Sequence, residues 1–103
     1  MKTETDKRVI DFLGIEAKKH PWIKKIILFG SRARGDAHPT SDFDLAVVTE
    51  GECSKEWTYL SSDWHEDIPT LCSIDLIHLN TLHNDPLRES IQKEGINIYE
   101  RHN

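Results

Sequence analysis

Two short apolar runs separated by a turn-rich segment constrain the fold of this chain most. The first run, Ile23–Phe29, contains three isoleucines and ends at Gly30, and the second occupies residues 43–48. Short apolar runs bounded by turn residues are typical of buried β-strands. Ser31 directly follows the first strand and can cap a short helix that ends near Gly35. We therefore expect strand, short helix, turn and strand in that order, with the turn at residues 36–41.

Helical patterns flank these two strands. The remaining predicted elements are helices at residues 5–19, 54–67 and 85–93 and strands at residues 73–79 and 96–99. Pro21 closes the first helix and Gly95 the last, because neither residue favours continued α-helix. Three large aromatic residues of the middle helix, Trp57, Tyr59 and Trp64, either fill the core or form a docking face.

Size and charge limit the classes of function. The chain has 103 residues and shows no repeat or linker, so we expect a single domain over residues 1–103. Its 13 basic and 18 acidic residues give a formal charge of −5, which disfavours stable nucleic-acid binding because such binding depends on neutralising phosphates. No apolar stretch has the length of a membrane span or the pattern of a signal peptide, so we expect a cytoplasmic protein without membrane contact.

Gly30 and Ser31 mark a candidate phosphate site. They lie between a predicted strand and a short helix, where backbone N–H groups can bind a phosphate anion. Gly30 lets the backbone approach the ligand, and Ser31 adds a hydroxyl donor. Arg34 follows about one helical turn later and can donate two hydrogen bonds to phosphate oxygens. The alternative is an ordinary strand-to-helix turn with a surface arginine.

Three aspartates interrupt the predicted strands. Asp42 and Asp44 are two residues apart, so along a strand their side chains leave the same face while their neighbours point to the other. Asp75 stands inside an apolar run, where a buried charge needs a partner. Magnesium prefers oxygen ligands and is commonly shared between carboxylates and substrate phosphates. The alternative is that Asp42 caps a loop, Asp44 faces solvent on an edge strand and Asp75 forms an ion pair.

The spacing of these residues resembles a known signature. Gly30-Ser31, ten intervening residues and Asp42-Phe43-Asp44 resemble the G-S-x10-D-x-D pattern of the DNA polymerase β-like nucleotidyltransferase superfamily. The runs at residues 29–36 and 41–47 are similar to its minimal nucleotidyltransferase (MNT) subgroup, and the resemblance covers nearly the whole chain. It implies an α/β (α+β) fold of the polymerase β-like type, with a short mixed β-sheet flanked by helices.

The resemblance also implies a reaction, in which a nucleoside monophosphate is transferred from a triphosphate such as ATP with the help of two Mg²⁺ ions, or Mn²⁺ in their place. The implied residues are Asp42, Asp44 and Asp75 for metal binding and catalysis and Gly30, Ser31 and Arg34 for the nucleotide. Asp75 would also take or orient the proton of the attacking hydroxyl. Arg32 has no firm role in the pattern. Two metal ions can stabilise the entering and leaving oxygens of such a displacement.

The MNT subgroup suggests a partner as well. Its members are commonly encoded beside a HEPN-domain toxin and act as antitoxins by transferring AMP onto a toxin hydroxyl, so the resemblance implies a protein adenylyltransferase. Two alternatives stay open. The chain could be a non-catalytic antitoxin that masks its partner, or it could modify a small molecule such as an antibiotic, although relatives with that activity generally carry an added acceptor-binding domain.

Overall fold

Helices and strands alternate along the chain in the computed structural model, which describes residues 4–38 and 41–101. The elements are α1 (Glu4–Lys18), β1 (Ile23–Phe29), α2 (Ser31–Arg34), β2 (Phe43–Thr49), α3 (Ser54–Asp67), β3 (Ile74–His78), the 3-10 helix η1 (Leu79–Thr81), α4 (Asp85–Glu94) and β4 (Ile96–Glu100). Every helix and strand predicted from the sequence is confirmed. None of the helices in the described ranges has the length and apolar character to cross a membrane.

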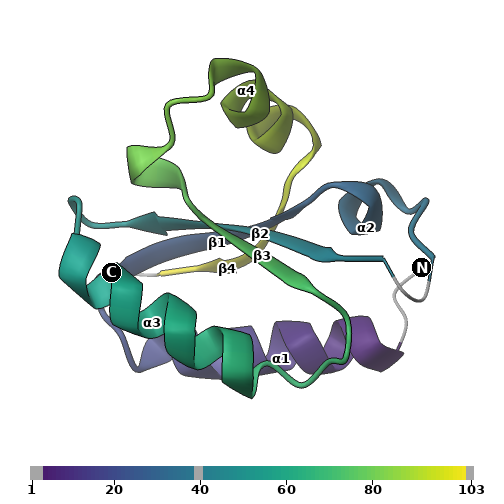
Figure 1. Ribbon diagram of the computed structural model, residues 1–103, viewed down its shortest axis with the longest axis horizontal. Helices are drawn as coiled ribbons and strands as arrows, with labels where there is room; N and C mark the ends of the chain where they lie inside the picture. The colour runs from purple at the N-terminus through teal and green to yellow at the C-terminus, as the bar shows by residue number, and fades with distance from the viewer. Residues whose placement is uncertain (1–3, 39–40, 102–103) are drawn as a thin grey trace.

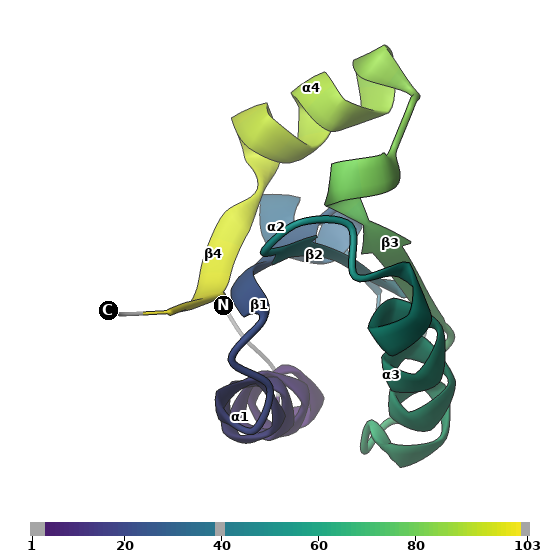
Figure 2. The same ribbon diagram turned by 90° about the vertical axis from the view of Figure 1, so that its left-hand side faces the viewer.

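The four strands form one mixed sheet in the order β3-β2-β1-β4. β1 is antiparallel to both β2 and β4, and β2 is parallel to β3. Helices α1 and α3 cover one face of the sheet, whereas η1 and α4 lie over the other face (Figures 1 and 2). α2 lies at one end of the sheet, directly after β1 (Figure 1). The mixed sheet flanked by helices is therefore confirmed.

Each face of the sheet buries its own apolar cluster. The larger one joins the sheet to α1 and α3, and its members are Val9, Leu13, Ala17, Ile23, Ile26, Leu28, Phe43, Leu45, Val47, Leu60, Trp64 and Ile68. The smaller one lies beneath α4 and consists of Ile27, Phe29, Ala46, Leu79 and Ile91. Alternation along β2 therefore sends Phe43 and Leu45 towards α1 and α3, and it sends Asp44 and Ala46 towards the α4 side.

The third strand is shorter than the predicted range of residues 73–79. It ends at His78, and the chain then turns into η1. The Asn80 side chain replaces the next step of the ladder, because its Oδ1 accepts from the Thr49 N–H at 2.8 Å and its Nδ2 donates to the Thr49 carbonyl at 2.9 Å. A side chain that imitates a strand backbone leaves no periodic signal in the sequence.

The helix ends predicted at Gly35 and Gly95 are confirmed, and Gly35 is the left-handed residue that ends α2, with a φ of 87°. Gly95 ends α4 as expected, but its φ of −69° is not left-handed. Glycine is required there for another reason, since an added Cβ would collide with the Ile91 carbonyl oxygen and the Ile27 side chain.

The turn predicted at residues 36–41 contains a hydrogen bond from the Ser41 N–H to the His38 carbonyl at 2.9 Å. Pro39 and Thr40 of this turn lie outside the described residues.

The aromatic residues of α3 divide between core and surface. Trp64 is 1% exposed and belongs to the larger apolar cluster, whereas Tyr59 is 66% exposed. Trp57 stacks on the imidazole of His78, with ring centroids 4.9 Å apart and planes inclined by 19°. Core filling and exposure on the surface therefore both occur within one helix.

The His78 contacts predict a loss of stability in acid. Its Nε2 lies 2.8 Å from Thr49 Oγ1, which itself donates to the Gly51 carbonyl, so the neutral ring donates from Nε2. Burial lowers the pKa of His78, against a weaker opposing effect of Glu52. A lowered folded-state pKa means that the unfolded chain binds the proton more tightly, so stability is complete above the ordinary histidine pKa and is lost below it. As the pH is lowered from 7.5 to 5.5, the melting temperature of the protein should fall, and that of His78→Gln should fall less. Equal falls in the two proteins would contradict the role assigned to His78.

Candidate active site

The candidate site lies where one end of the sheet meets α2. Phe29 at the end of β1 is the register partner of Asp44 near the start of β2, and Asp44 is the partner of Asp75 near the start of β3. The antiparallel pairing of β1 with β2 and the parallel pairing of β2 with β3 bring these three strand ends together, beside α2 (Figure 1). Residues separated by 31 positions in the chain, Asp44 and Asp75, thereby become neighbours.

The carboxylates of Asp44 and Asp75 leave the same face of the sheet. The residues next to each of them, such as Phe43 and Ile74, pack against the cluster beneath α1 and α3, so the two aspartates point to the α4 side. β2 is an interior strand, which excludes the alternative that Asp44 lies on a sheet edge. Asp42 stands one residue before β2, and it is exposed.

The expectation of a buried charge at Asp75 is wrong. Asp75 is exposed, because β3 is one of the two outer strands of the sheet and only its last residue is buried. No ion pair involves Asp75 within residues 4–38 and 41–101, so the alternative in which Asp75 pairs with a lysine or arginine is not observed. The half-buried carboxylate of the cluster is Asp44.

The negative charges of the cluster act on Asp44. Burial raises the pKa of Asp44 above its usual range, the charges of Asp75 and Asp42 raise it further, and the positive charge of Arg34 opposes them. The carboxylates of Asp75 and Asp42 therefore each make ionisation of Asp44 less favourable. A cation at this position would relieve the repulsion.

Gly30 is in contact with this cluster. Its φ of 75° and ψ of −156° lie in a region that is essentially restricted to glycine. A Cβ built at this position would collide with the carboxylate of Asp44. The approach of a phosphate to Gly30 stays a prediction, and the group close to Gly30 in this structure is the Asp44 carboxylate of the neighbouring strand.

Ser31 does not cap α2, contrary to the sequence prediction. Gly30 is the cap residue, no side-chain cap hydrogen bond is formed, and Ser31 is already the first residue of the helix. The Gly30 carbonyl accepts from the N–H groups of Ala33 and Arg34, each at 3.1 Å. The N–H group of Ser31 belongs to the first helical turn, in which a helix provides no acceptor of its own.

Arg34 lies between the loop and α4. Its Nε is 3.3 Å from Asp36 Oδ2 and its Nη1 is 3.1 Å from Glu94 Oε2, and the side chain is 47% exposed. Arg34 is close enough to the carboxylate cluster for its charge to act on Asp44. A phosphate at this site would therefore compete with Glu94 for the guanidinium.

The donor chemistry fits a hard divalent cation, although the protein does not form a complete ligand cage. Among the described residues, no group of three histidine, cysteine or acidic side chains is arranged to hold a metal ion. Magnesium is usually bound by one or two carboxylates together with substrate phosphates, so a cage made only of protein groups is not required. Asp44 and its neighbours Asp42 and Asp75 supply carboxylate oxygens beside the turn at Gly30.

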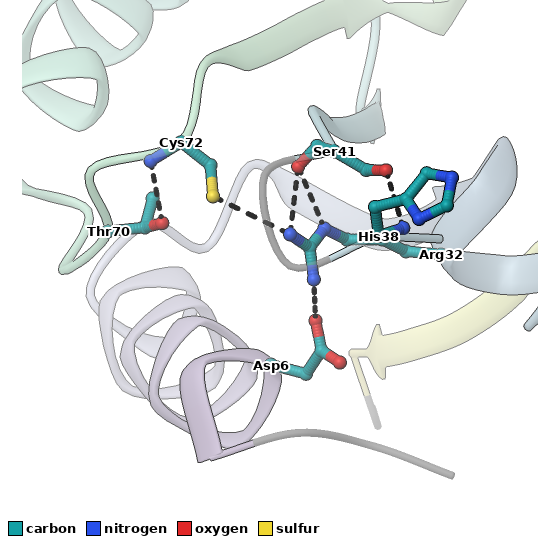
Figure 3. A network of polar contacts seen from close by, with 6 residues as sticks. All are labelled: Asp6, Arg32, His38, Ser41, Thr70 and Cys72. Carbon is teal, nitrogen blue, oxygen red and sulfur yellow. Dashed lines mark hydrogen bonds and ion pairs between the residues drawn. The ribbon is translucent and has the colours of Figure 1, made fainter. Parts of the chain in front are cut away.

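Arg32, for which the sequence pattern gave no firm role, has an extensive set of contacts (Figure 3). Its guanidinium pairs with Asp6 of α1 at 2.7 Å and donates to the Ser41 carbonyl. One sequence signal could have found this pair. Asp6 lies three, seven and eleven residues before Val9, Leu13 and Ala17, so a charge occupies the buried stripe of α1.

Comparison with known proteins identifies the family. Residues 14–103 match the family model described as "Polymerase beta, Nucleotidyltransferase". A protein of Methanocaldococcus jannaschii named "Putative protein adenylyltransferase" is 30% identical over 83 residues, which cover 81% of this chain and 84% of that protein. The six proposed site residues, from Gly30 to Asp75, lie within the region that matches the family model.

Solved structures share the fold. A chain from a toxin–antitoxin crystal structure with AMP-PNP has a TM-score of 0.62 and 22% identity, and the match covers 96% of this chain and 75% of that one. A chain from the complex of the tri-AMPylated HEPN toxin of Shewanella oneidensis with its MNT antitoxin has a TM-score of 0.63 and 17% identity, with 94% and 73% covered. The protein is thus a nucleotidyltransferase of the polymerase beta nucleotidyltransferase family.

Proposed function

We propose that this protein transfers AMP from ATP, with a divalent metal ion, onto a hydroxyl group of a partner protein. The observation that supports this proposal most is the pairing of Asp44 with Asp75 on one face of the sheet, beside the glycine turn of Gly30. Carboxylates from two neighbouring strands beside a glycine turn suit a metal–triphosphate complex. The acidic net charge favours a protein acceptor over a polynucleotide.

We assign the groups of the site as follows. Asp42 and Asp44 would hold the metal ions, Mg²⁺ or Mn²⁺, and Asp75 would complete the site. Bound metal would neutralise the charge that develops on the transferred phosphoryl group and on pyrophosphate. Ser31 and the backbone at Gly30 would bind the terminal phosphates.

The step itself is a displacement at the α-phosphorus. The oxygen of the acceptor hydroxyl forms a bond to this phosphorus, and the bond from phosphorus to the pyrophosphate oxygen breaks. The hydroxyl proton passes to Asp75, which is exposed and can release it to solvent. Asp44 lies beside Asp75 and stays ionised when its charge is balanced by a cation. Positioning and charge thus account for catalysis, and no protein nucleophile is needed.

The proposed acceptor is a HEPN-domain toxin, which would make this chain a cytoplasmic antitoxin. This assignment rests on the fold shared with the chains of toxin–antitoxin complexes, one of which contains an AMPylated HEPN toxin. The M. jannaschii relative, named as a protein adenylyltransferase, supports the choice of AMP and of a protein acceptor. Masking of the partner without catalysis is the competing function.

Labelled transfer tests the proposal directly. The protein would be incubated with ATP labelled at the α-phosphate, Mg²⁺ and the product of the adjacent gene, and the label would be followed by gel and by mass spectrometry. We expect one AMP group per modified hydroxyl, and loss of labelling on chelation by EDTA. Neutralisation of the partner by an Asp42/Asp44 double variant to the same degree as by the unaltered protein would instead establish masking.

The Glu94 carboxylate gives a separate prediction about phosphate binding. If Arg34 binds phosphate, Glu94 competes for the same guanidinium. Glu94→Gln should then lower the KM for ATP by at most about fivefold, since an exposed ion pair is weak. Glu89→Gln, on the same helix and also exposed, provides the control. An unchanged KM in Glu94→Gln would remove Arg34 from the phosphate site.

A further inference from the structure

We propose that Arg32 is a positioning residue, which binds no nucleotide and instead fixes the starts of β2 and β3 so that Asp42, Asp44 and Asp75 stay in register. The inference rests on the proposed function, because it concerns the geometry of that site. Four observations carry it, and each concerns a contact of one buried guanidinium (Figure 3).

The first contact fixes the peptide in front of Asp42. Nε and Nη2 of Arg32 both donate to the Ser41 carbonyl oxygen, at 3.1 and 2.8 Å. That carbonyl belongs to the peptide unit that joins Ser41 to Asp42. Two donors on one acceptor restrict the tilt of the peptide plane, so they restrict the direction in which the Asp42 side chain leaves the backbone.

The second contact anchors the guanidinium to the first helix. Nη1 of Arg32 lies 2.7 Å from Asp6 Oδ1, and the two side chains are only 3% and 11% exposed. A pair so far removed from water holds its geometry, because separation would leave two uncompensated charges away from solvent. α1 therefore provides a fixed point to which the segment before β2 is tied.

The third contact places Arg32 on the far side of the sheet from the carboxylates. Its guanidinium carbon lies 3.9 Å from the centre of the Phe43 ring. Phe43 belongs to the cluster beneath α1 and α3, whereas Asp44 points to the α4 side. The Arg32 guanidinium thus lies on the opposite side of β2 from the Asp44 carboxylate.

The fourth contact extends to the strand of Asp75. Nη2 of Arg32 lies 3.5 Å from Cys72 Sγ, and the Cys72 N–H donates to Thr70 Oγ1 at 3.0 Å. The carbonyl of Ser73, the next residue, accepts from the Phe43 N–H at 2.9 Å. One side chain therefore contacts both segments that enter β2 and β3, and these strands carry the carboxylates of the site.

Arginine is required for this set of contacts, and lysine is not equivalent. The guanidinium is a planar fork with five donors, whereas the lysine ammonium is a compact charge on a flexible stem. Arg32→Lys can keep the charge opposite Asp6, but it cannot also make two bonds to Ser41 and lie flat over Phe43. The substitution therefore removes the geometry and retains the charge.

The test compares Arg32→Lys with Arg8→Lys, the same substitution at an exposed position of α1. Three quantities are measured on the full chain: kcat and KM for ATP with the partner protein, the affinity for Mn²⁺ alone, and amide hydrogen exchange of residues 41–45. For Arg32→Lys we expect kcat and Mn²⁺ affinity to fall by about 10- to 100-fold, as for residues that orient metal ligands. The KM for ATP should stay close to that of the unaltered protein, and exchange should rise at residues 41–45 ahead of the rest of the chain. Arg8→Lys should change none of these.

Each other outcome has a defined meaning. A raised KM with unchanged kcat would show that Arg32 binds nucleotide, and equal behaviour of Arg32→Lys and Arg8→Lys would show that it positions nothing; either overturns the inference. If Arg32→Lys does not fold, Asp6→Asn is judged by the same criteria, since it keeps the fork and removes its anchor. Absence of transfer by the unaltered protein would refute the proposed function alone, and the Mn²⁺ affinity and exchange of residues 41–45 would still decide the role of Arg32.

Discussion

Asp44→Asn is expected to reduce AMP transfer by about 10³-fold or more while the protein remains folded. Asp44 is half-buried in the carboxylate cluster and is the register partner of Asp75, so it lies between the other proposed ligands. Charge stabilisation by a metal ion contributes several kcal/mol to a transition state, and each ~1.4 kcal/mol is a factor of ten in rate. Asparagine keeps the size of the side chain and removes the charge that binds the cation.

The measurement is the initial rate of label transfer at saturating ATP and Mg²⁺. Asp63→Asn is the matched control, because it changes the net charge by the same amount at an exposed position of α3, on the other face of the sheet. The control should transfer AMP at the rate of the unaltered protein. Transfer that persists in Asp44→Asn would refute the metal-site assignment.

Asp44→Asn, which is expected to lose activity, is not expected to lose stability in a thermal melt without metal. The pKa of Asp44 is raised by burial and by Asp75 and Asp42, so the folded state holds its proton more tightly than the unfolded chain. Stability therefore falls as the pH rises past the ordinary aspartate pKa towards the raised one, and the full cost is present above the raised pKa. Without metal at pH 7, Asp44→Asn should melt at or above the temperature of the unaltered protein. A clear decrease would mean that the Asp44 carboxylate stabilises the fold.

Gly30→Ala is expected to have the second-largest effect, because it disturbs both the backbone and the carboxylate. The φ and ψ of Gly30 belong to a region that costs other residues about 1–3 kcal/mol. The new Cβ would also collide with the Asp44 carboxylate, which must then move. Displacement of a catalytic group by about 1 Å can lower the rate about 10²-fold. We therefore expect Gly30→Ala to lower the free energy of unfolding by about 1–3 kcal/mol and to lower the transfer rate about 10²-fold.

Alanine substitutions at two other glycines separate the effect of backbone strain from the effect of displacing the Asp44 carboxylate. Gly35 also has a positive φ, of 87°, but a Cβ there would meet nothing within 4 Å, so Gly35→Ala should show the backbone strain alone. Gly14 lies inside α1 with open space around it, and Gly14→Ala should stabilise the protein by up to about 1 kcal/mol through helix propensity. Chemical denaturation and transfer rates would be measured for all three. A rate loss in Gly35→Ala equal to that in Gly30→Ala would contradict the proposed contact with Asp44.

Local sequence patterns predicted the elements well, and they missed contacts made by single side chains. The bounds of β1 and α3 agree with the predicted ranges, since the apolar runs and the helical spacing are properties of a few neighbouring residues. The Asn80 side chain that extends the ladder of β2 was not predictable, because the amide replaces backbone groups without altering any periodicity. The exposure of Asp75 was mispredicted because its apolar neighbours do not reveal that β3 is an outer strand.

The sequence by itself determined which residues can act chemically: Gly30 at the end of a strand, Asp42 and Asp44 at strand spacing, and a third strand carrying Asp75. These are properties of short segments, set by the side-chain alternation of a strand and the conformational freedom of glycine. Only the tertiary structure decided that β3 lies beside β2 and β4 beside β1, since strand order depends on how the helices bury both faces of the sheet. It also placed the Asp44 carboxylate against Gly30 and the buried Arg32 guanidinium against Asp6, because residues so distant in sequence meet only through packing.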